Sequence, residues 1–395
     1  MKVKHFISLI ILIQFSVIIQ AQIIPGLVTS DVRCGAERTE LYLQLISGKR
    51  IGVVANPSSR IHNVHLVDSL TRCGVRVMKI FAPEHGFRGE GEAGAVIQGG
   101  VDPVTRIPVI SLYGKHKKPT PDDLADLDIL VFDIQDVGAR FYTYISTLHL
   151  VMEACAEGGK PLVVLDRPNP NGFYVDGPVL DTAFHSFVGM HPVPVVYGMT
   201  IGEYARMVNG EGWLKGGVSC SLTVIPCEGY THQTAYVLPV KPSPNLPDQV
   251  SIYLYPSLCF FEGTIISVGR GTEFPFKVYG SPKMKGSFHF TPQSKPGNSQ
   301  HPMYENLVCY GRDLNGNGVT ELSHRPGIML EWLIDAYEKS GKPSDFFTGY
   351  FDTLAGTDRL RRQIQQGMTA DEIRATWKDG LDRFAAIRCK YLIYK

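Results

Sequence analysis

The sequence of 395 residues lacks the short motifs that mark several common enzyme classes. It contains no phosphate-binding P-loop, no GxSxG nucleophile elbow and no HExxH zinc motif. The turn after the first predicted strand reads NPSSR at residues 56–60, whereas dinucleotide binding needs glycines there so that the pyrophosphate can approach the helix start. A dinucleotide-dependent oxidoreductase is therefore the weakest functional alternative, and the sequence predicts no cofactor.

The eight cysteines form no CxxC pair and no Cys/His cluster with zinc spacing, so the sequence predicts no metal site. Their spacing fixes no disulfide pairing. Cys73 and Cys155 fall on the apolar faces of predicted helices, where a buried free thiol is the commoner state. We therefore expect these two side chains to be buried.

An excess of charge of one sign is also missing. Lysine plus arginine number 39 and aspartate plus glutamate 38, which leaves a net charge of +1. No global field attracts the chain to nucleic acid or to an anionic membrane, so we expect a partner that is recognised at a local site. The composition indicates no particular oligomeric state.

Long apolar runs are absent after the amino-terminal segment. Residues 1–22 have the pattern of a signal peptide, because lysines precede an apolar stretch at residues 6–19 and Ala21 supplies the small residue before a cleavage near Gln22. An uncleaved anchor helix is the alternative, but the stretch contains polar residues and is short for crossing about 30 Å of hydrocarbon. We expect cleavage, a periplasmic or secreted mature protein and no stable membrane insertion.

Apolar segments alternate with helical patterns through the first two thirds of the chain. The predicted strands are residues 50–56, 75–81, 108–112, 129–133, 161–166 and 223–226. This alternation predicts an α/β fold, with a Rossmann-like, mostly parallel sheet covered by helices on both faces. We assign residues 23–280 to this catalytic domain and residues 281–395 to a smaller α+β auxiliary domain, with helices at 327–339 and from Thr369 onward.

Polar clusters follow the predicted strands at the point where each strand ends. Because the carboxyl ends of parallel strands share one edge of the sheet, these clusters are expected to line one crevice. Their most informative members are Asn56, Glu84, Tyr113, Asp133 and Asp166. We expect Asn56 to contact the substrate and Asp166 to act as a turn-forming acceptor.

The PEHG loop places Glu84 and His85 directly after an apolar strand. A carboxyl group against an apolar wall tends to have a raised pKa, which suits a proton donor. Alternatively, both side chains fix the loop backbone by hydrogen bonds. The loop alone supports the two interpretations equally.

The segment FDIQDVGARFYTY at residues 132–144 gathers two carboxylates, an arginine and two tyrosines. Asp133 and Asp136 are expected to bind sugar hydroxyls or to supply a second catalytic carboxylate. Alternatively, Asp133 is a buried acceptor for loop amides and for Arg140. Arg140 can equally hold a substrate carboxylate, because its planar fork suits bidentate recognition. Tyr142 and Tyr144 are expected to form a stacking platform.

Two later loops carry polar side chains that are expected to close the crevice from its far side. PSPNLP presents Asn245 on a rigid loop, and the segment EGTIISVGRGTEFPF presents Glu262 and Arg270.

Seven stretches together resemble one family in their order along the chain. They are FAPEHGFRGE, PVISLYG, ILVFDIQDVGARFYTYISTL, LDRPNPNG, YGMTIGE, PSPNLP and FEGTIISVGRGTEFPF. As an ordered set they resemble the exo-beta-N-acetylmuramidase family of glycoside hydrolases, formerly a domain-of-unknown-function family. The resemblance implies a Rossmann-like domain joined to a smaller domain, and release of terminal N-acetylmuramic acid from the non-reducing end of peptidoglycan fragments during cell-wall turnover.

Carried over by motif, the resemblance implicates the PEHG residues, the FDIQDVGAR residues and the acidic and basic residues of the later loops. These are Glu84, His85, Asp133, Asp136, Arg140, Glu262 and Arg270. One departure is VPVVYGMT, where Val196 and Tyr197 replace a cation and often a histidine of other members, which bears on how the lactyl carboxylate of the sugar is held.

Glycoside hydrolysis needs a protonated carboxyl at the leaving oxygen and a second carboxylate as nucleophile or base. We assign Glu84 as the general acid and Asp133, Asp136 or Glu92 as its partner, all meeting around one sugar ring. Assistance by the acetamido group of the substrate is the alternative to a protein nucleophile. A non-catalytic cell-wall sugar-binding protein that uses the same crevice is the rival function.

Overall fold

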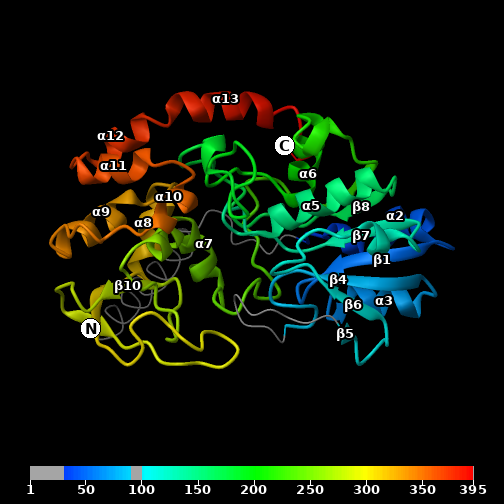
Figure 1. The fold of residues 1–395 in the computed structure, drawn as a ribbon, viewed down its shortest axis with the longest axis horizontal. Coiled ribbons are helices and arrows are strands. Elements are labelled where there is room, and N and C mark those ends of the chain that lie inside the picture. The colour runs from blue at the N-terminus through cyan, green and yellow to red at the C-terminus, as the bar shows by residue number, and fades with distance from the viewer. Residues whose placement is uncertain (1–30, 90–99, 395) are drawn as a thin grey trace, which may run out of the picture.

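The computed structural model describes residues 31–89 and 100–394, which form a large sheet domain and a smaller carboxyl-terminal part (Figure 1). The predicted signal peptide and Glu92 lie outside the described residues.

A seven-stranded sheet is the framework of the first part. Its strands are β1 (Arg50–Ala55), β4 (Arg76–Ala82), β5 (Gly100–Val101), β6 (Pro108–Ser111), β7 (Ile129–Asp133), β8 (Leu162–Leu165) and β9 (Leu222–Ile225). They lie in the order β5-β6-β4-β1-β7-β8-β9, and the pairs are parallel except for β5 with β6. The direction of winding therefore reverses between β1 and β7, which is the place where doubly wound sheets bind ligands. The predicted fold class is confirmed.

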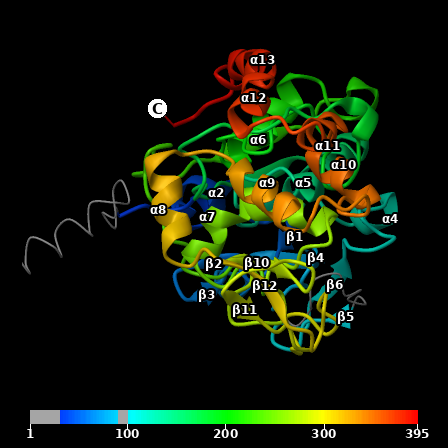
Figure 2. The same ribbon diagram turned by 90° about the vertical axis from the view of Figure 1, so that its left-hand side faces the viewer.

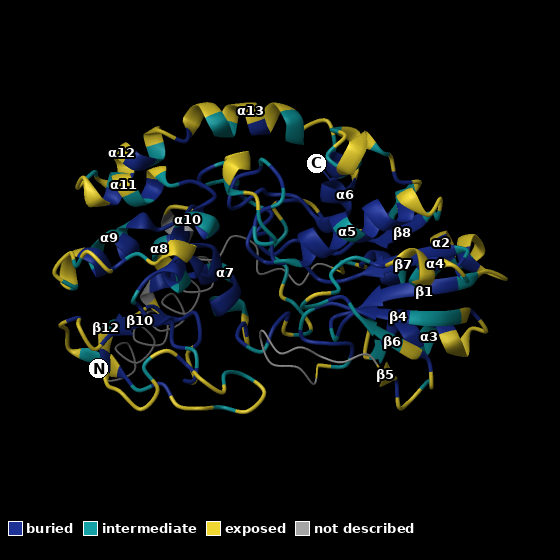
Figure 3. Ribbon diagram, viewed as in Figure 1, coloured by how far each residue is buried: buried dark blue, intermediate teal, exposed yellow. Residues whose placement is uncertain are grey.

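Helices cover both faces of this sheet because its strands are apolar on both sides (Figure 3). On one face, alternate residues such as Ile51 and Val131 pack in one core with α2 (Thr39–Ile46) and α3 (Leu66–Arg72). On the other face, Val54 and Phe132 belong to a larger core. That core contains α4 (Pro121–Leu124), α5 (Tyr144–Glu157) and α6 (Ile201–Gly210).

The predicted helix starts are present. Thr120 caps α4 and accepts a hydrogen bond from the backbone N–H of Asp123. Thr200 and Glu203 form a capping box at the start of α6. The local signals therefore fix where these two helices begin.

The remaining elements of the first part are short. They are the hairpin β2 (Arg60–Ile61) and β3 (Val64–His65), the 3₁₀ turns η1 (Gly35–Glu37), η2 (Thr182–Phe184) and η3 (Lys215–Gly217), and then α7 (Gln249–Leu258) and η4 (Cys259–Gly263).

The carboxyl-terminal part joins an antiparallel sheet to a series of helices. The sheet has the order β10-β12-β11, and the boundary predicted at residue 280 falls inside β10. Its elements are β10 (Val278–Ser281), β11 (Phe288–Phe290), β12 (Cys309–Asp313), α8 (Asn317–His324), α9 (Leu330–Lys339), α10 (Gly349–Ala355), α11 (Arg359–Gln365), α12 (Ala370–Ala375) and α13 (Lys378–Arg388).

The prediction of one continuous helix from Thr369 is wrong, because the structure divides it into α12 and α13. The Thr376 hydroxyl donates to the Ile373 carbonyl at 2.6 Å, and such side-chain bonds to the preceding turn compete with helix continuation. The apolar stripe nevertheless continues across the break, since Ile373, Trp377 and Phe384 are all buried.

The end of the chain returns to the sheet domain. Helix α13 lies above α6 in both views (Figures 1 and 2), and the Arg388 side chain donates to the carbonyl of Gly198. Tyr394 donates its hydroxyl to the buried Asp166 carboxylate at 2.6 Å. Asp166 is thus a structural acceptor, as predicted, and it ties the carboxyl terminus to the turn after β8.

Cys155 is buried as expected, whereas the prediction for Cys73 is wrong. Cys73 follows the last residue of α3 as its C-cap and is exposed. Within the described residues, no helix combines the length and the apolar character needed to cross a bilayer.

Candidate active site

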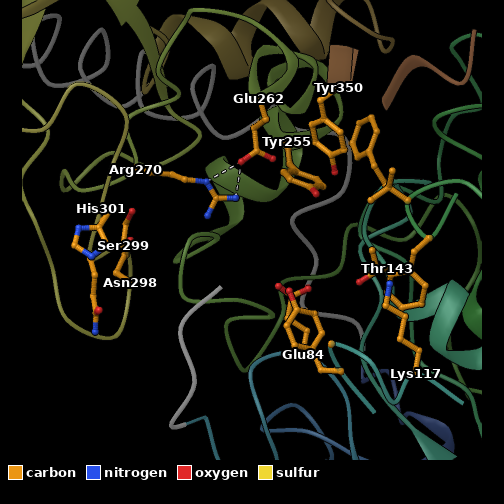
Figure 4. A pocket seen from close by; sticks show the side chains of 16 residues that line it. Glu84, Lys117, Thr143, Tyr255, Glu262, Arg270, Asn298, Ser299, His301 and Tyr350 are labelled. Carbon is orange, nitrogen blue, oxygen red and sulfur yellow. Dashed lines mark hydrogen bonds and ion pairs between the residues drawn. The ribbon is translucent and has the colours of Figure 1, made fainter. Parts of the chain in front are cut away.

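A cavity of about 950 Å³ lies between the carboxyl edge of the large sheet and the carboxyl-terminal part (Figure 4). Its floor comes from the loops after β4 and β6, and its opposite wall from α7, η4 and the segment at residues 298–301. The lining residues that the argument uses are Glu84, Tyr113, Lys117, Phe187, Tyr255, Glu262, Arg270 and Tyr350.

A smaller cavity of about 80 Å³ adjoins it and shares Glu84, Tyr255 and Arg270 with it. The predicted site residues that line one or both cavities are Glu84, His85, Tyr142, Tyr144, Asn245, Glu262 and Arg270. The structure therefore brings together residues that lie up to 186 positions apart, from Glu84 to Arg270.

Glu84 is presented by a tight turn at the end of β4. His85 has a φ of 71° and Gly86 one of 77°, and the Gly86 N–H donates to the carbonyl of Pro83 at 3.1 Å. This backbone turns the chain sharply and leaves Glu84 in both cavities, with buried His85 in the smaller one.

Tyr113, from the loop after β6, is hydrogen-bonded to the Glu84 side chain. Burial and the neighbouring Glu84 charge raise the pKa of Tyr113 to about 12, so its hydroxyl stays protonated and donates to the carboxyl group. Two strand ends thus hold the proposed acid in place.

Tyr142 and Tyr144 form a wall of the smaller cavity. Their rings meet edge to face with centroids 4.9 Å apart, and the Tyr142 hydroxyl donates to the carbonyl of Pro242 at 2.6 Å. The Asn56 side chain hydrogen-bonds to Tyr144 and also accepts from Ser58, but it does not line either cavity. The structure therefore places Asn56 beside Tyr144 rather than in the lining of a cavity.

Asn245 joins two loops at the cavity. Its Nδ2 donates to the carbonyl of Asn298 at 3.1 Å, while its buried Oδ1 has no hydrogen-bond partner in the described part of the chain. Since Asn245 lines the smaller cavity, this oxygen is available to a ligand or to water.

Glu262 and Arg270 face each other across 2.7 to 2.8 Å, as the dashed lines in Figure 4 mark. The guanidinium also lies over the ring of Phe276, 5.0 Å from its centroid. Among the described lining residues, Glu84 and Glu262 are the two carboxylates. Glu262 and Arg270, which the sequence analysis places on the far side of the crevice, line the large cavity opposite the loop that carries Glu84.

Asp133 does not meet Glu84, contrary to the prediction. It is fully buried at the end of β7, where Arg167 donates to its two oxygens at 2.6 and 2.9 Å, and neither cavity includes it. The alternative of a structural ion pair is correct for Asp133, but the partner is Arg167 rather than Arg140.

Asp136 also points away from both cavities. It accepts hydrogen bonds from the Tyr197 hydroxyl and, at 2.7 Å, from the Gly138 N–H. Burial raises the pKa of Asp136 to about 6, against the lowering effect of these donors. Glu92, the third proposed partner, lies outside the described residues and stays a prediction.

Arg140, which the sequence analysis assigns to the substrate, lines neither cavity in the structure. Its side chain is fully buried and donates at 2.7 to 3.1 Å to backbone carbonyls. These acceptors are Pro178, Val193, Leu354 and Ala355.

Val196 and Tyr197, which replace a cation of the resembled family, are core residues here. Both are fully buried and neither lines a cavity. The substitution therefore removes no cation from the cavity itself.

The sequence interpretation missed several lining residues. Lys117 follows β6 by six positions, too far from the strand end to be singled out, and Tyr255 lies within an apolar helix. Tyr350 and residues 298–301 belong to the part predicted to be auxiliary. In the described residues, no group of three or more histidine, cysteine or acidic side chains is arranged to hold a metal ion.

Family models match nearly the whole described chain. The model described as exo-beta-N-acetylmuramidase NamZ, N-terminal, matches residues 51–250, and its C-terminal counterpart matches residues 253–394. The chain belongs to the NamZ family. The predicted resemblance is thereby confirmed, and membership of the NamZ family makes the protein a glycoside hydrolase.

Relatives of known sequence and structure agree with the NamZ assignment. The chain is 38% identical over 381 residues to the peptidoglycan beta-N-acetylmuramidase NamZ of Bacillus subtilis strain 168, covering 89% of each chain. A DUF1343 family protein of Bacteroides fragilis NCTC 9343 superposes with a TM-score of 0.86 at 46% identity, covering 93% of this chain and 99% of that one. A second DUF1343 protein of that strain gives a TM-score of 0.79 at 29% identity, with coverage of 92% and 99%.

Proposed function

We propose that this glycoside hydrolase releases terminal N-acetylmuramic acid from the non-reducing end of peptidoglycan fragments. The observation that carries the proposal is the meeting of Glu84 and Glu262 in one cavity at the carboxyl edge of the sheet, in a member of the NamZ family. The cavity volume of about 950 Å³ lies within the usual range for small-ligand sites, roughly 300 to 1,000 Å³.

In this mechanism Glu84 is the general acid. It donates a proton to the glycosidic oxygen while the bond from that oxygen to the anomeric carbon breaks. Water then supplies the hydroxyl of the released sugar, and the proton that this water loses replaces the one that Glu84 donated. Tyr113 keeps the carboxyl group oriented by its hydrogen bond. A donor fixed in this way acts with little loss of orientation on binding.

Glu262 is the carboxylate that the cavity offers as the counterpart of Glu84. Arg270 holds this carboxylate at 2.7 Å, where it faces the cavity and can stabilise positive charge on the sugar ring as the bond breaks. Glu92 and the acetamido group of the substrate are the other possible partners, and the variants discussed below distinguish Glu262 from them.

We further propose that the protein acts outside the cytoplasm, in the periplasm or as a secreted enzyme, during cell-wall turnover. The support is the signal-peptide pattern of residues 1–22 and a substrate class that occurs in the cell wall. Amino-terminal sequencing of the mature protein after cell fractionation tests this, with cleavage near Gln22 as the expected result.

The deciding experiment is incubation with a defined MurNAc-GlcNAc disaccharide, followed by mass spectrometry. Free N-acetylmuramic acid is expected from the wild type and not from Glu84→Gln. The disaccharide GlcNAc-GlcNAc serves as the substrate control. Saturable binding without product would instead establish the rival function, a non-catalytic sugar-binding protein.

A further inference from the structure

The described lining residues of the large cavity include one lysine and one arginine, Lys117 and Arg270. They differ in their partners. Arg270 is held by the Glu262 carboxylate at 2.7 Å, so its charge is largely compensated before a ligand arrives. Within the described part of the chain, Lys117 forms no ion pair, and its ammonium contacts the ring of Phe187, 4.3 Å from the centroid.

The neighbours of Lys117 in the KHKK segment are oriented differently. Lys118 is bound by Glu153 at 2.5 Å and by Glu157 at 2.8 Å, and His116 lies 3.1 Å from Asp123. The carboxylate partners of these two side chains belong to α4 and α5. Among these four residues of the described structure, Lys117 alone lines the cavity. Figure 4 shows its side chain there.

Phe187 gives the ammonium a defined position. The backbone carbonyl of Phe187 accepts a hydrogen bond from the Ser146 hydroxyl of α5 at 2.7 Å, which fixes the segment that carries the ring. A cation over an aromatic face is attracted to the ring and still keeps N–H donors for a second partner. Lys117 is therefore a positioned cation that can bind an anion.

We propose that Lys117 binds the lactyl carboxylate of N-acetylmuramic acid and thereby selects this sugar over N-acetylglucosamine. The inference rests on the proposed function. The two sugars differ by the lactyl ether on C3, which brings one carboxylate. A carboxylate that leaves water for this cavity needs a cation as its partner, and Arg270 is already paired with Glu262.

The test compares three 4-nitrophenyl β-glycosides, of N-acetylmuramic acid, of its neutral lactyl amide and of N-acetylglucosamine. For the wild type, the lactyl carboxylate is expected to raise kcat/KM by about 10- to 100-fold over the amide, the usual range for a charged hydrogen bond. Lys117→Met is expected to lose this factor on the acid and to treat the acid and the amide alike. Lys117→Arg is expected to restore part of it.

Lys115→Met is the matched control. Lys115 lies two positions before Lys117, is exposed and does not line the cavity, so this substitution removes a lysine of the same segment without changing the site. It is expected to keep the wild-type preference for the acid. A Lys117→Met variant that retains the wild-type ratio of acid to amide overturns the inference, as does equal loss on all three substrates. Wild-type discrimination between acid and amide needs no variant, so a wild type that cleaves both equally overturns the inference even if the variants do not fold.

A wild type that cleaves none of the three glycosides, nor the disaccharide, refutes the proposed function itself. That result is obtained before any variant is made. The failure of the function and the failure of the Lys117 inference are therefore told apart.

Discussion

Arg167 encloses the Asp133 carboxylate with hydrogen bonds of 2.6 and 2.9 Å, and both side chains are buried. The pair joins the end of β7 to the loop after β8, next to the switch point of the sheet. A carboxylate in this position resembles a catalytic group by its place after a strand, yet its oxygens are already used within the protein.

Asp133→Asn is expected to destabilise the protein strongly without removing activity. The substitution leaves the Arg167 charge buried without its counterion, a change that typically costs about 3 to 5 kcal/mol. Urea unfolding measures the loss, and turnover of an aryl N-acetylmuramide well below the melting temperature is expected to stay within a few-fold of the wild type. If the folded variant lost turnover by several orders of magnitude, Asp133 would have a direct role in catalysis.

Glu84→Gln is expected to lower kcat at least 10³-fold while the melting temperature changes little. The amide keeps the shape and can still accept from Tyr113, but it cannot protonate the glycosidic oxygen. Steady-state kinetics with an aryl N-acetylmuramide measure the effect. Tyr113→Phe is the graded control, with an expected loss of about tenfold because only the orienting hydrogen bond is removed.

Much of the fold follows from local signals in the sequence. Apolar runs such as β7 mark strands buried on both faces, and the capping boxes at Thr200 and Thr369 mark helix starts. Strand alternation then fixes a parallel sheet, and the strand ends indicate the edge where Glu84 lies. These features depend on neighbours in the chain, which is why they could be predicted.

The remainder of the site depends on which way each side chain points. Asp133 and Glu84 both follow strands, but Arg167 draws Asp133 inward, and the sequence does not encode that choice locally. Tyr350 reaches the cavity because α10 packs against the sheet domain, a contact between residues far apart in sequence. Sequence patterns therefore located the edge of the sheet but did not select every residue in the cavity.

Asp136 is expected to give stability a distinctive pH dependence. Its folded pKa of about 6 exceeds the unfolded value near 4, so the folded state holds the extra proton between these values. Stability from this group is fully present below about pH 4 and is lost as the pH rises through 6. The shift corresponds to a loss on the order of 3 kcal/mol.

Asp136→Asn removes this titration and keeps an oxygen that can accept from Tyr197. Urea unfolding at intervals from pH 4 to 8 measures the unfolding free energy of both proteins. The wild type is expected to lose stability relative to the variant as the pH rises. Asp166, whose pKa is also raised to about 6 by burial, contributes equally to both proteins and cancels. If this difference in unfolding free energy did not change with pH, Asp136 would not be the group that binds the extra proton in the folded state.

Glu262 and Arg270 are expected to act as a unit. Glu262→Gln should lower kcat/KM by about 10² because the second carboxyl group of the cavity is lost. Arg270→Gln should lower kcat/KM by a similar factor, because it releases Glu262 from its position. The double variant is expected to be little worse than either single one. Fully multiplicative losses in this double-mutant cycle would show that the two side chains act independently.

Arg140 is expected to position Tyr350 from a distance. Its guanidinium donates to the carbonyls of Leu354 and Ala355 at the carboxyl end of α10, while Tyr350 lies near the start of that helix and lines the cavity. A cation at a helix carboxyl terminus also compensates the helix dipole. One buried side chain thus connects the sheet domain to a wall of the active site.

Arg140→Lys retains the charge but cannot reach four carbonyls, so it is expected to cost on the order of 3 kcal/mol and to raise KM by several-fold as Tyr350 shifts. Arg361→Lys is the matched control, because Arg361 binds Asp352 of α10 from a partly exposed position. This substitution should change the unfolding free energy by less than about 1 kcal/mol. Urea unfolding and Michaelis–Menten kinetics measure the two effects. If Arg140→Lys lowered stability with KM unchanged, the guanidinium would hold the fold without placing Tyr350, and the coupling between them would have to be abandoned.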